Sequence, residues 1–218
     1  MEQTILSNDQ LLVLDFIRRK SEVNRYFYLT GGTALAEFYL QHRYSDDIDF
    51  FTNEKDFPQL VVESAAKEIG SIIGAREIEY KKLYDRRIFF FKKDGDELKM
   101  EFTQYPFLHL QQPQNNNQLL VDSFEDIAAN KLMALIDRIE PKDFVDLFFI
   151  LQKTNLENIL NLVKRKFDFK IDPLVLGSEF AKIKGVTIMP KMIKPLSLEK
   201  LKTFYSDSAK QLKPQIVE

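Results

Sequence analysis

The stretch that decides the fold is YLTGGTALAEFYLQHRYSDDIDFFT, residues 28–52. Its apolar start predicts a short strand, which ends at the glycine pair Gly31-Gly32. The residues from Thr33 to His42 then show the apolar spacing of an amphipathic helix. Glycines at the start of a helix leave main-chain N–H groups exposed, so the pair suits phosphate binding; the alternative is a plain turn.

Two acids stand at the start of a second predicted strand, residues 48–52. Asp47 and Asp49 are two residues apart, so their carboxylates point to the same side of the strand. Neighbouring carboxylates repel each other, and a divalent cation between them removes the repulsion. The alternative is a solvated strand face that also includes Asp46. A phosphate-binding turn beside a metal-binding acid pair has the chemistry of nucleotidyl transfer.

Composition limits the kind of metal that the chain can hold. The 218 residues include no cysteine and only two histidines, His42 and His109, so thiolate and histidine-rich zinc sites are excluded. A site built from oxygen ligands favours Mg²⁺ or Mn²⁺. The net charge of -2 argues against a basic nucleic-acid binder, although clusters of Lys and Arg leave room for a local basic groove.

Hydropathy and the N-terminal residues bear on location. With 44% hydrophobic and 29% charged residues, the composition is that of a soluble globular protein. No run of eighteen apolar residues predicts a membrane span, and MEQTILSNDQ does not resemble a signal peptide. We therefore expect a cytoplasmic protein that does not contact a membrane.

The chain changes character near its middle. We expect an α/β domain over residues 1–112 and a helical domain over 119–218, joined by the polar segment QQPQNNNQ at 111–118. The expected fold class is α+β: a small mixed-sheet core with helices on one face, followed by a C-terminal helical bundle. The expected strands span 26–29, 48–52, 77–83, 87–92 and 98–105, and the expected helices 9–19, 33–42, 60–69, 123–138, 141–153, 156–165, 173–184 and 198–212.

The segments GGTAL and HRYSDDIDFF together resemble the AbiEii/AbiGii-type nucleotidyltransferases of bacterial abortive-infection toxin–antitoxin systems. These enzymes lie within the DNA polymerase β-like nucleotidyltransferase superfamily. The resemblance implies a phosphate-binding turn, a metal-binding acid pair and a short approach to that pair. The residues that match are Gly31, Gly32 and Thr33 for the turn, Asp47 and Asp49 for the pair, and Arg43 and Ser45 for the approach.

The resemblance also implies a third acid on a later strand, and Glu101 in LKMEFTQY matches it. Its implied role is to complete the metal site and to help deprotonate the attacking hydroxyl. The alternative is an exposed glutamate on an edge strand. In the helical half, Lys131 lies in DIAANKLMALIDR, where the resemblance implies a contact with the triphosphate. The alternative for Lys131 is a surface lysine whose stem covers apolar neighbours.

Asp143 and Asp146 lie in RIEPKDFVDLFFIL, which resembles the acidic helix that closes the family's motif set. Three residues apart, they share one helix face, and the resemblance implies a role at the nucleotide site. Two alternatives remain open. Asp143 follows Pro141 in the first helical turn, where the helix dipole favours an anion, and Arg138 and Lys142 could pair with both acids.

These features predict a metal-dependent enzyme that transfers a nucleoside monophosphate from an NTP to an acceptor hydroxyl. The resemblance implies the toxin of a toxin–antitoxin pair, with tRNA or another RNA as acceptor and an antitoxin protein as partner. One alternative is a small-molecule nucleotidyltransferase of the aminoglycoside type. Another is an inactive module that binds nucleotide or antitoxin.

Overall fold

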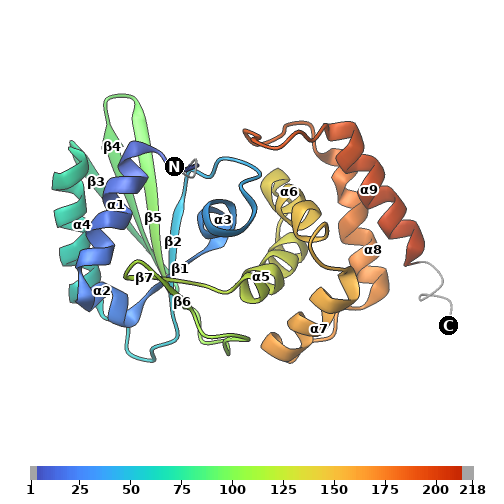
Figure 1. The fold of residues 1–218 in the computed structure, drawn as a ribbon, viewed down its shortest axis with the longest axis horizontal. Helices are drawn as coiled ribbons and strands as arrows, with labels where there is room; N and C mark the ends of the chain where they lie inside the picture. Colours follow the sequence, from blue (N-terminus) through green and yellow to red (C-terminus); the bar gives the residue numbers. More distant parts are fainter. Residues whose placement is uncertain (1–3, 213–218) are drawn as a thin grey trace. The chain divides into compact units, whose positions relative to one another are not determined.

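The computed structural model describes residues 4–212, which divide into two compact units (Figure 1). The N-terminal unit runs to Tyr39 and continues from Ser45 to Ser123. The C-terminal unit contains Leu40–Tyr44 and the chain from Phe124 onward.

One mixed sheet organises the described part of the N-terminal unit. Its strand order is β3-β4-β5-β2-β1-β7-β6. Strand β2 runs antiparallel to β1 and parallel to β5, and β7 runs parallel to β1. The strands are β1 (Tyr28–Thr30), β2 (Ile48–Thr52), β3 (Glu77–Leu83), β4 (Arg86–Lys93), β5 (Asp96–Gln104), β6 (Gln114–Asn116) and β7 (Leu119–Val121).

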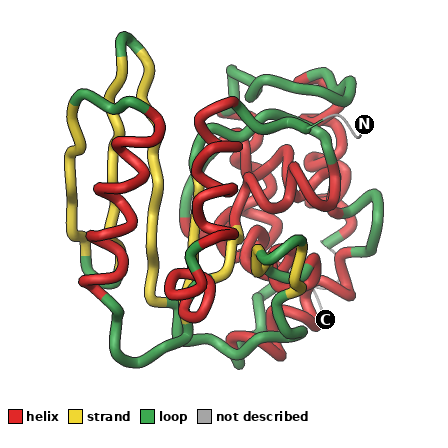
Figure 2. Tube along the Cα trace, turned by 60° about the vertical axis from the view of Figure 1, so that its left-hand side comes forward, coloured by secondary structure: helices red, strands yellow, loops and turns green. Residues whose placement is uncertain are grey.

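Helices cover the two faces of this sheet unequally. On one face lie α1 (Asn8–Arg19), α2 (Ser21–Tyr26) and α4 (Gln59–Ile73), as Figures 1 and 2 show. Towards this face, alternate residues of the central strands are fully buried, Phe50 and Phe102 among them, and their rings stack at 5.3 Å. The other face carries α3 (Gly31–Ala34) and the π-helical segment Leu35–Leu40.

The C-terminal unit is a helical bundle around aromatic side chains. Tyr205 is fully buried; its hydroxyl donates to the main-chain oxygen of Phe144 at 2.7 Å, and its ring meets Phe144 and Phe180 edge-on. Residues 40–44 join this unit through a hydrogen bond from Tyr44 N to Lys191 O at 2.9 Å. The helices are α5 (Phe124–Asp137), α6 (Pro141–Ile150), α7 (Leu156–Phe167), α8 (Pro173–Ala181), the 3-10 turn Lys182–Gly185 and α9 (Leu198–Gln211).

The expected α+β class, with a mixed sheet and a helical C-terminal bundle, is confirmed. Several local expectations differ from the structure. Strand β7 lies where the helical domain was expected to begin, and the first strand, expected over 26–29, spans Tyr28–Thr30. Helix α2 was not expected, because its six residues bury only Val23 and therefore show no apolar period. The helix expected from Thr33 begins at Gly31 and is π-helical from Leu35. The segment expected as a linker forms β6, whose three residues are all exposed and so carry no alternating pattern.

No helix within residues 4–212 is both long and apolar enough to cross a membrane.

Candidate active site

The glycine turn lies directly against the second acid of the pair. Gly31 has a φ of 71°, in the left-handed region that favours glycine. A Cβ atom at this position would fall on the carboxylate oxygen Oδ2 of Asp49. Both the backbone conformation and the space therefore require glycine at position 31. The turn opens α3, so the first main-chain N–H groups of that helix lie beside Asp49.

Two side chains anchor this turn. Thr33 Oγ1 donates a short hydrogen bond to the main-chain oxygen of Asp47, which ties α3 to the approach to β2. Thr30 Oγ1 donates to Asp122 Oδ2 at 2.7 Å, and Tyr39 donates to the main-chain oxygen of Asp122 at the same distance. Asp122, at the end of β7, is fully buried. The turn is therefore held from both ends.

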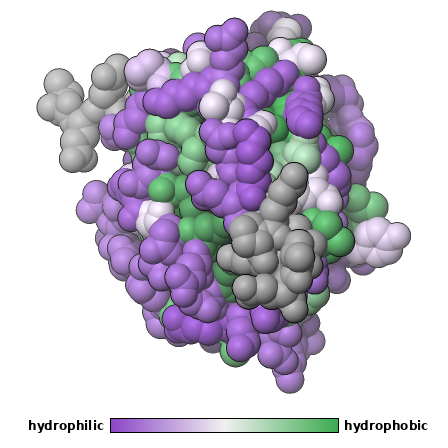
Figure 3. Space-filling model, turned by 90° about the vertical axis from the view of Figure 1, so that its right-hand side faces the viewer, coloured by the Kyte–Doolittle hydropathy of each residue, from purple (hydrophilic) through white to green (hydrophobic). Residues whose placement is uncertain are grey.

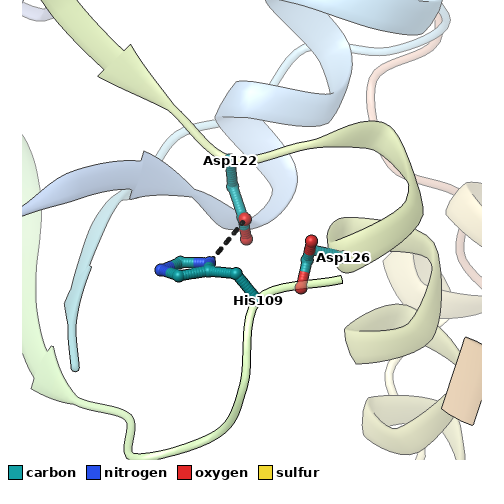
Figure 4. Close-up of side chains that lie close together, drawn as sticks. All are labelled: His109, Asp122 and Asp126. Atoms are coloured by element: carbon teal, nitrogen blue, oxygen red, sulfur yellow. Dashed lines mark ion pairs between the residues drawn. The ribbon is translucent and has the colours of Figure 1, made fainter. Parts of the chain in front are cut away.

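Figure 4 shows the surroundings of Asp122. His109 Nδ1 lies 4.0 Å from Asp122 Oδ1, and the ring of His109 meets that of Tyr28 edge-on at 4.8 Å. The third side chain drawn, Asp126, belongs to the C-terminal unit, where Lys166 Nζ binds it at 2.5 Å. Asp122 thus combines contacts to the glycine turn with a histidine neighbour.

The sheet register brings the third acid beside the pair. Asp49 on β2 is opposite Thr30 on β1 and opposite Glu101 on β5, although 52 residues separate Asp49 from Glu101. Asp47 precedes β2 on the same side of the chain and is partly exposed. The three predicted acids therefore gather at the N-terminal end of β2, next to the glycine turn.

Glu101 is held by an extensive set of donors. The Arg86 guanidinium donates to both of its carboxylate oxygens at 2.5 Å, and Thr103 Oγ1 donates to Oε1 at 2.6 Å. Burial alone raises the pKa of Glu101. The hydrogen bonds from Arg86 and Thr103, with the nearby charge of Lys99, outweigh burial and bring the pKa below its ordinary value. Glu101 is consequently ionised at neutral pH.

Ser45 also belongs to the N-terminal unit. It is buried, and its main-chain oxygen accepts a hydrogen bond from Gln10 Nε2 at 2.7 Å. Gln10 is itself fixed by the capping box that opens α1. This contact anchors the chain two residues before Asp47.

The remaining predicted residues form a separate buried cluster in the C-terminal unit. Arg43 binds both oxygens of Asp146, at 2.6 and 2.8 Å. Lys131 Nζ lies 2.6 Å from Asp146 Oδ2 and 3.0 Å from Asp143 Oδ1. Arg138 Nε donates to Asp143 Oδ2 at 2.8 Å, the pairing expected for this arginine and Asp143.

The electrostatics of this cluster are those of a paired network. Burial alone would raise the pKa of Asp146 and lower that of Lys131. The charges of Lys131 and Arg43 hold the pKa of Asp146 well below its ordinary value, and the two carboxylates raise the pKa of Lys131. His42 Nε2 lies 2.8 Å from Asp146 Oδ1, yet burial dominates and lowers the histidine pKa. The acids and Lys131 are therefore charged at neutral pH, while His42 is neutral.

The predicted site residues thus form one group in each unit, and the structure adds neighbours that sequence reasoning missed. Lys99 Nζ lies 3.3 Å from Asp47 Oδ2 and 3.7 Å from Glu101 Oε2. Its two-residue spacing from Glu101 on one strand was a usable signal. Arg86 and Asp122 carried no such signal, because their contacts depend on strand pairing between distant segments.

The sequence of this chain matches one protein family and one relative of known sequence. The model of a family described as "Nucleotidyl transferase AbiEii toxin, Type IV TA system" matches residues 15–215. An uncharacterised protein of Aquifex aeolicus, aq_aa25, is 38% identical over 153 residues, which cover 66% of this chain and 69% of that protein.

Two solved structures have a similar fold. JHP933 from Helicobacter pylori has 22% sequence identity and a TM-score of 0.58, with 95% of this chain and 90% of that chain covered. MenT4, the nucleotidyltransferase toxin Rv2826c from Mycobacterium tuberculosis H37Rv, has 15% identity and a TM-score of 0.50. That match covers 94% of this chain and 84% of the MenT4 chain.

The contact between Gly31 and Asp49 predicts the effect of adding one methyl group. Gly31→Ala introduces backbone strain and pushes against Asp49, so we expect a loss of about 2–4 kcal/mol in unfolding free energy. Urea denaturation followed by circular dichroism measures the loss.

Gly74 supplies a matched control, because it has the same φ of 71° and nothing within 4 Å of an added Cβ. Gly74→Ala should cost only the backbone strain, about 1 kcal/mol. Equal losses for the two variants would show that the approach to Asp49 is not tight.

Proposed function

We propose that this chain, which belongs to the AbiEii nucleotidyl transferase toxin family, transfers a nucleoside monophosphate from an NTP to an acceptor hydroxyl and releases pyrophosphate. The observation that carries the proposal is the position of the glycine turn, which lies against Asp49 while Asp49 lies beside Glu101. A polyphosphate at the turn would therefore meet a group of carboxylates.

The residues present fit a divalent metal. Lys99 Nζ approaches both Asp47 and Glu101, so these two carboxylates are near enough to share one cation. All the donors in question are carboxylate oxygens, which suit Mg²⁺ or Mn²⁺. We propose Asp47, Asp49 and Glu101 as the ligands. When bound, the metal would supply charge stabilisation for the attacking and leaving oxygens.

The low pKa of Glu101 refines its role. A carboxylate whose pKa is lowered stays ionised, as a metal ligand must. It is also a weaker base than an ordinary glutamate, so we favour the ligand role over proton abstraction.

The turn and its anchors bind and orient the substrate in this proposal. The main-chain N–H groups at Gly31, Gly32 and Thr33 would receive the β- and γ-phosphates, since a helix N-terminus favours anions. Thr33 and Asp122 hold those groups in place through the hydrogen bonds described above. Arg43 and Ser45 would fix the chain that leads into the acid pair.

For the acceptor we propose RNA, with tRNA as the leading candidate. The charge distribution supports a polyanion: residues 40–44 and 124–218 contain 17 of the 31 Lys and Arg residues, but only 13 of the 33 acids. Figure 3 shows a largely hydrophilic surface on the side of α8 and α9. We also propose a cytoplasmic location and a cognate antitoxin, as membership of a toxin–antitoxin family suggests.

Transfer should depend on the acid pair. With each labelled NTP in turn, Mg²⁺ and total cellular RNA, we expect one NTP to label RNA, and Asp47→Asn or Asp49→Asn to reduce labelling by at least a hundredfold. Each change removes one anionic metal ligand without changing side-chain size. A denaturing gel measures the labelled product.

Asp46→Asn is the matched control, because Asp46 is an exposed acid next to the pair. It should label RNA at the wild-type rate. Labelling of an aminoglycoside instead of RNA would favour the small-molecule alternative. Failure of every NTP with both acceptor types would favour an inactive binding module.

Lys131 is proposed as a triphosphate contact, with Asp143 and Asp146 holding its ammonium group in place. Lys131→Met should then raise the apparent NTP constant roughly ten- to hundredfold, the effect of one lost charge-assisted contact. Equilibrium binding of a fluorescent NTP analogue measures the change.

Lys166→Met is the control for a purely structural effect. Lys166 and Lys131 are 4% and 6% exposed, and each pairs with a carboxylate in the C-terminal unit. Both changes should lower stability, but only Lys131→Met should weaken NTP binding. If the two variants bind NTP equally well, the Lys131 cluster has only a structural role.

A further inference from the structure

The ammonium group of Lys99 lies close to two of the proposed metal ligands, Asp47 and Glu101. Lys99 lies on β5 two residues before Glu101, so both side chains leave the same face of the strand. Its ammonium group is 3.3 Å from Asp47 Oδ2 and 3.7 Å from Glu101 Oε2, and its side chain is 25% exposed. The lysine therefore lies between two carboxylates, one from the segment just before β2 and one from β5.

The other hydrogen bonds of Glu101 show which of its carboxylate positions are still open to a cation. A carboxylate has about four hydrogen-bonding positions. Arg86 Nε and Thr103 occupy those of Oε1, and Arg86 Nη2 occupies one on Oε2. These bonds leave one position on Oε2, and Lys99 Nζ lies 3.7 Å from this oxygen. Arg86 and Thr103 thus orient Glu101 and still leave room on Oε2, near which the ammonium group of Lys99 lies.

We propose that the ammonium group of Lys99 competes with the divalent metal for Asp47 and Glu101. Two cations cannot share this space, because like charges about 4 Å apart repel strongly at a partly buried site. Metal binding would therefore displace the ammonium group, and Lys99 would lower the affinity of the metal-binding acids for metal alone. The inference rests on the proposed metal site.

A second consequence follows for substrate binding. Because Lys99 belongs to β5, its displaced ammonium group remains near the acids, where it can bind a phosphate of the NTP. An NTP would then favour the displaced position of Lys99, so that metal and NTP assist each other's binding. Lys99 would thereby make metal loading depend on substrate.

Mn²⁺ binding tests this competition without any turnover. Free Mn²⁺ is measured by electron paramagnetic resonance during titration of the full chain in the absence of NTP. We expect Lys99→Met to bind Mn²⁺ about tenfold more tightly than wild type, since it removes the competing charge and keeps the apolar stem. Lys99→Arg keeps the charge and should bind Mn²⁺ as weakly as wild type.

Lys93→Met is the matched control for a general loss of positive charge. Lys93 lies on the adjacent strand β4 and pairs with Asp9 at 3.2 Å. Its removal should leave Mn²⁺ affinity unchanged. Urea denaturation of each variant confirms that the fold is intact.

The outcomes separate the inference from the function on which it rests. Unchanged or weaker Mn²⁺ binding by Lys99→Met overturns the competition, while the metal site stands if Asp47→Asn weakens binding in the same assay. Mn²⁺ binding that Asp47→Asn does not change overturns both. An equal gain for Lys93→Met and Lys99→Met also overturns the competition, because the effect would then come from net charge.

Discussion

The close approach of Gly31 to Asp49 is the constraint on which the candidate site depends. It places the N-terminus of α3 directly beside Asp49, the acid on β2. Any other residue at position 31 would need a strained left-handed backbone and would displace the carboxylate. The hydrogen bond from Thr33 to Asp47 and that from Thr30 to Asp122 fix the same geometry from either side. In the proposed site, this local packing in the N-terminal unit would couple phosphate binding to metal binding.

Electrostatic pairing dominates the polar interior of both units. Glu101 in the sheet and Asp146 in the bundle are each buried, and an arginine binds both carboxylate oxygens of each. Burial raises the pKa of both groups, but the bonds from Arg86 outweigh it at Glu101, and the charges of Lys131 and Arg43 outweigh it at Asp146. Such pairs gain little net stability, but they fix the direction of a carboxylate with high precision. For Glu101, a fixed direction would suit the proposed role as a metal ligand. For Asp146, the same arrangement positions Lys131.

The sequence predicted those parts of the fold that have a strong local pattern. Strand 48–52 was predicted with its observed bounds, because apolar residues flank Asp49 along it, and membership of the AbiEii family was recognised from the glycine turn and the acids. Helix α2 and strand β6 lack such a pattern: α2 packs against α1 and α4, and β6 pairs with β7 in a hairpin. The register between Asp49 and Glu101 depends on strand pairing across the sheet, so Arg86 and Asp122 could not be identified as neighbours of the site. The two-residue spacing of Lys99 from Glu101 was a usable signal for the third neighbour. The roles of the predicted site residues remain predictions.

The central claim is that the glycine turn and the three acids form one site for a metal and a triphosphate. Crystals grown with Mn²⁺ and a non-hydrolysable NTP analogue test it most directly through anomalous diffraction. We expect an Mn²⁺ peak about 2.1 Å from carboxylate oxygens of Asp47, Asp49 and Glu101, with the β- and γ-phosphates at the main-chain N–H groups of residues 31–33. A peak at His109 and Asp122, or a triphosphate bound away from the turn, would contradict it.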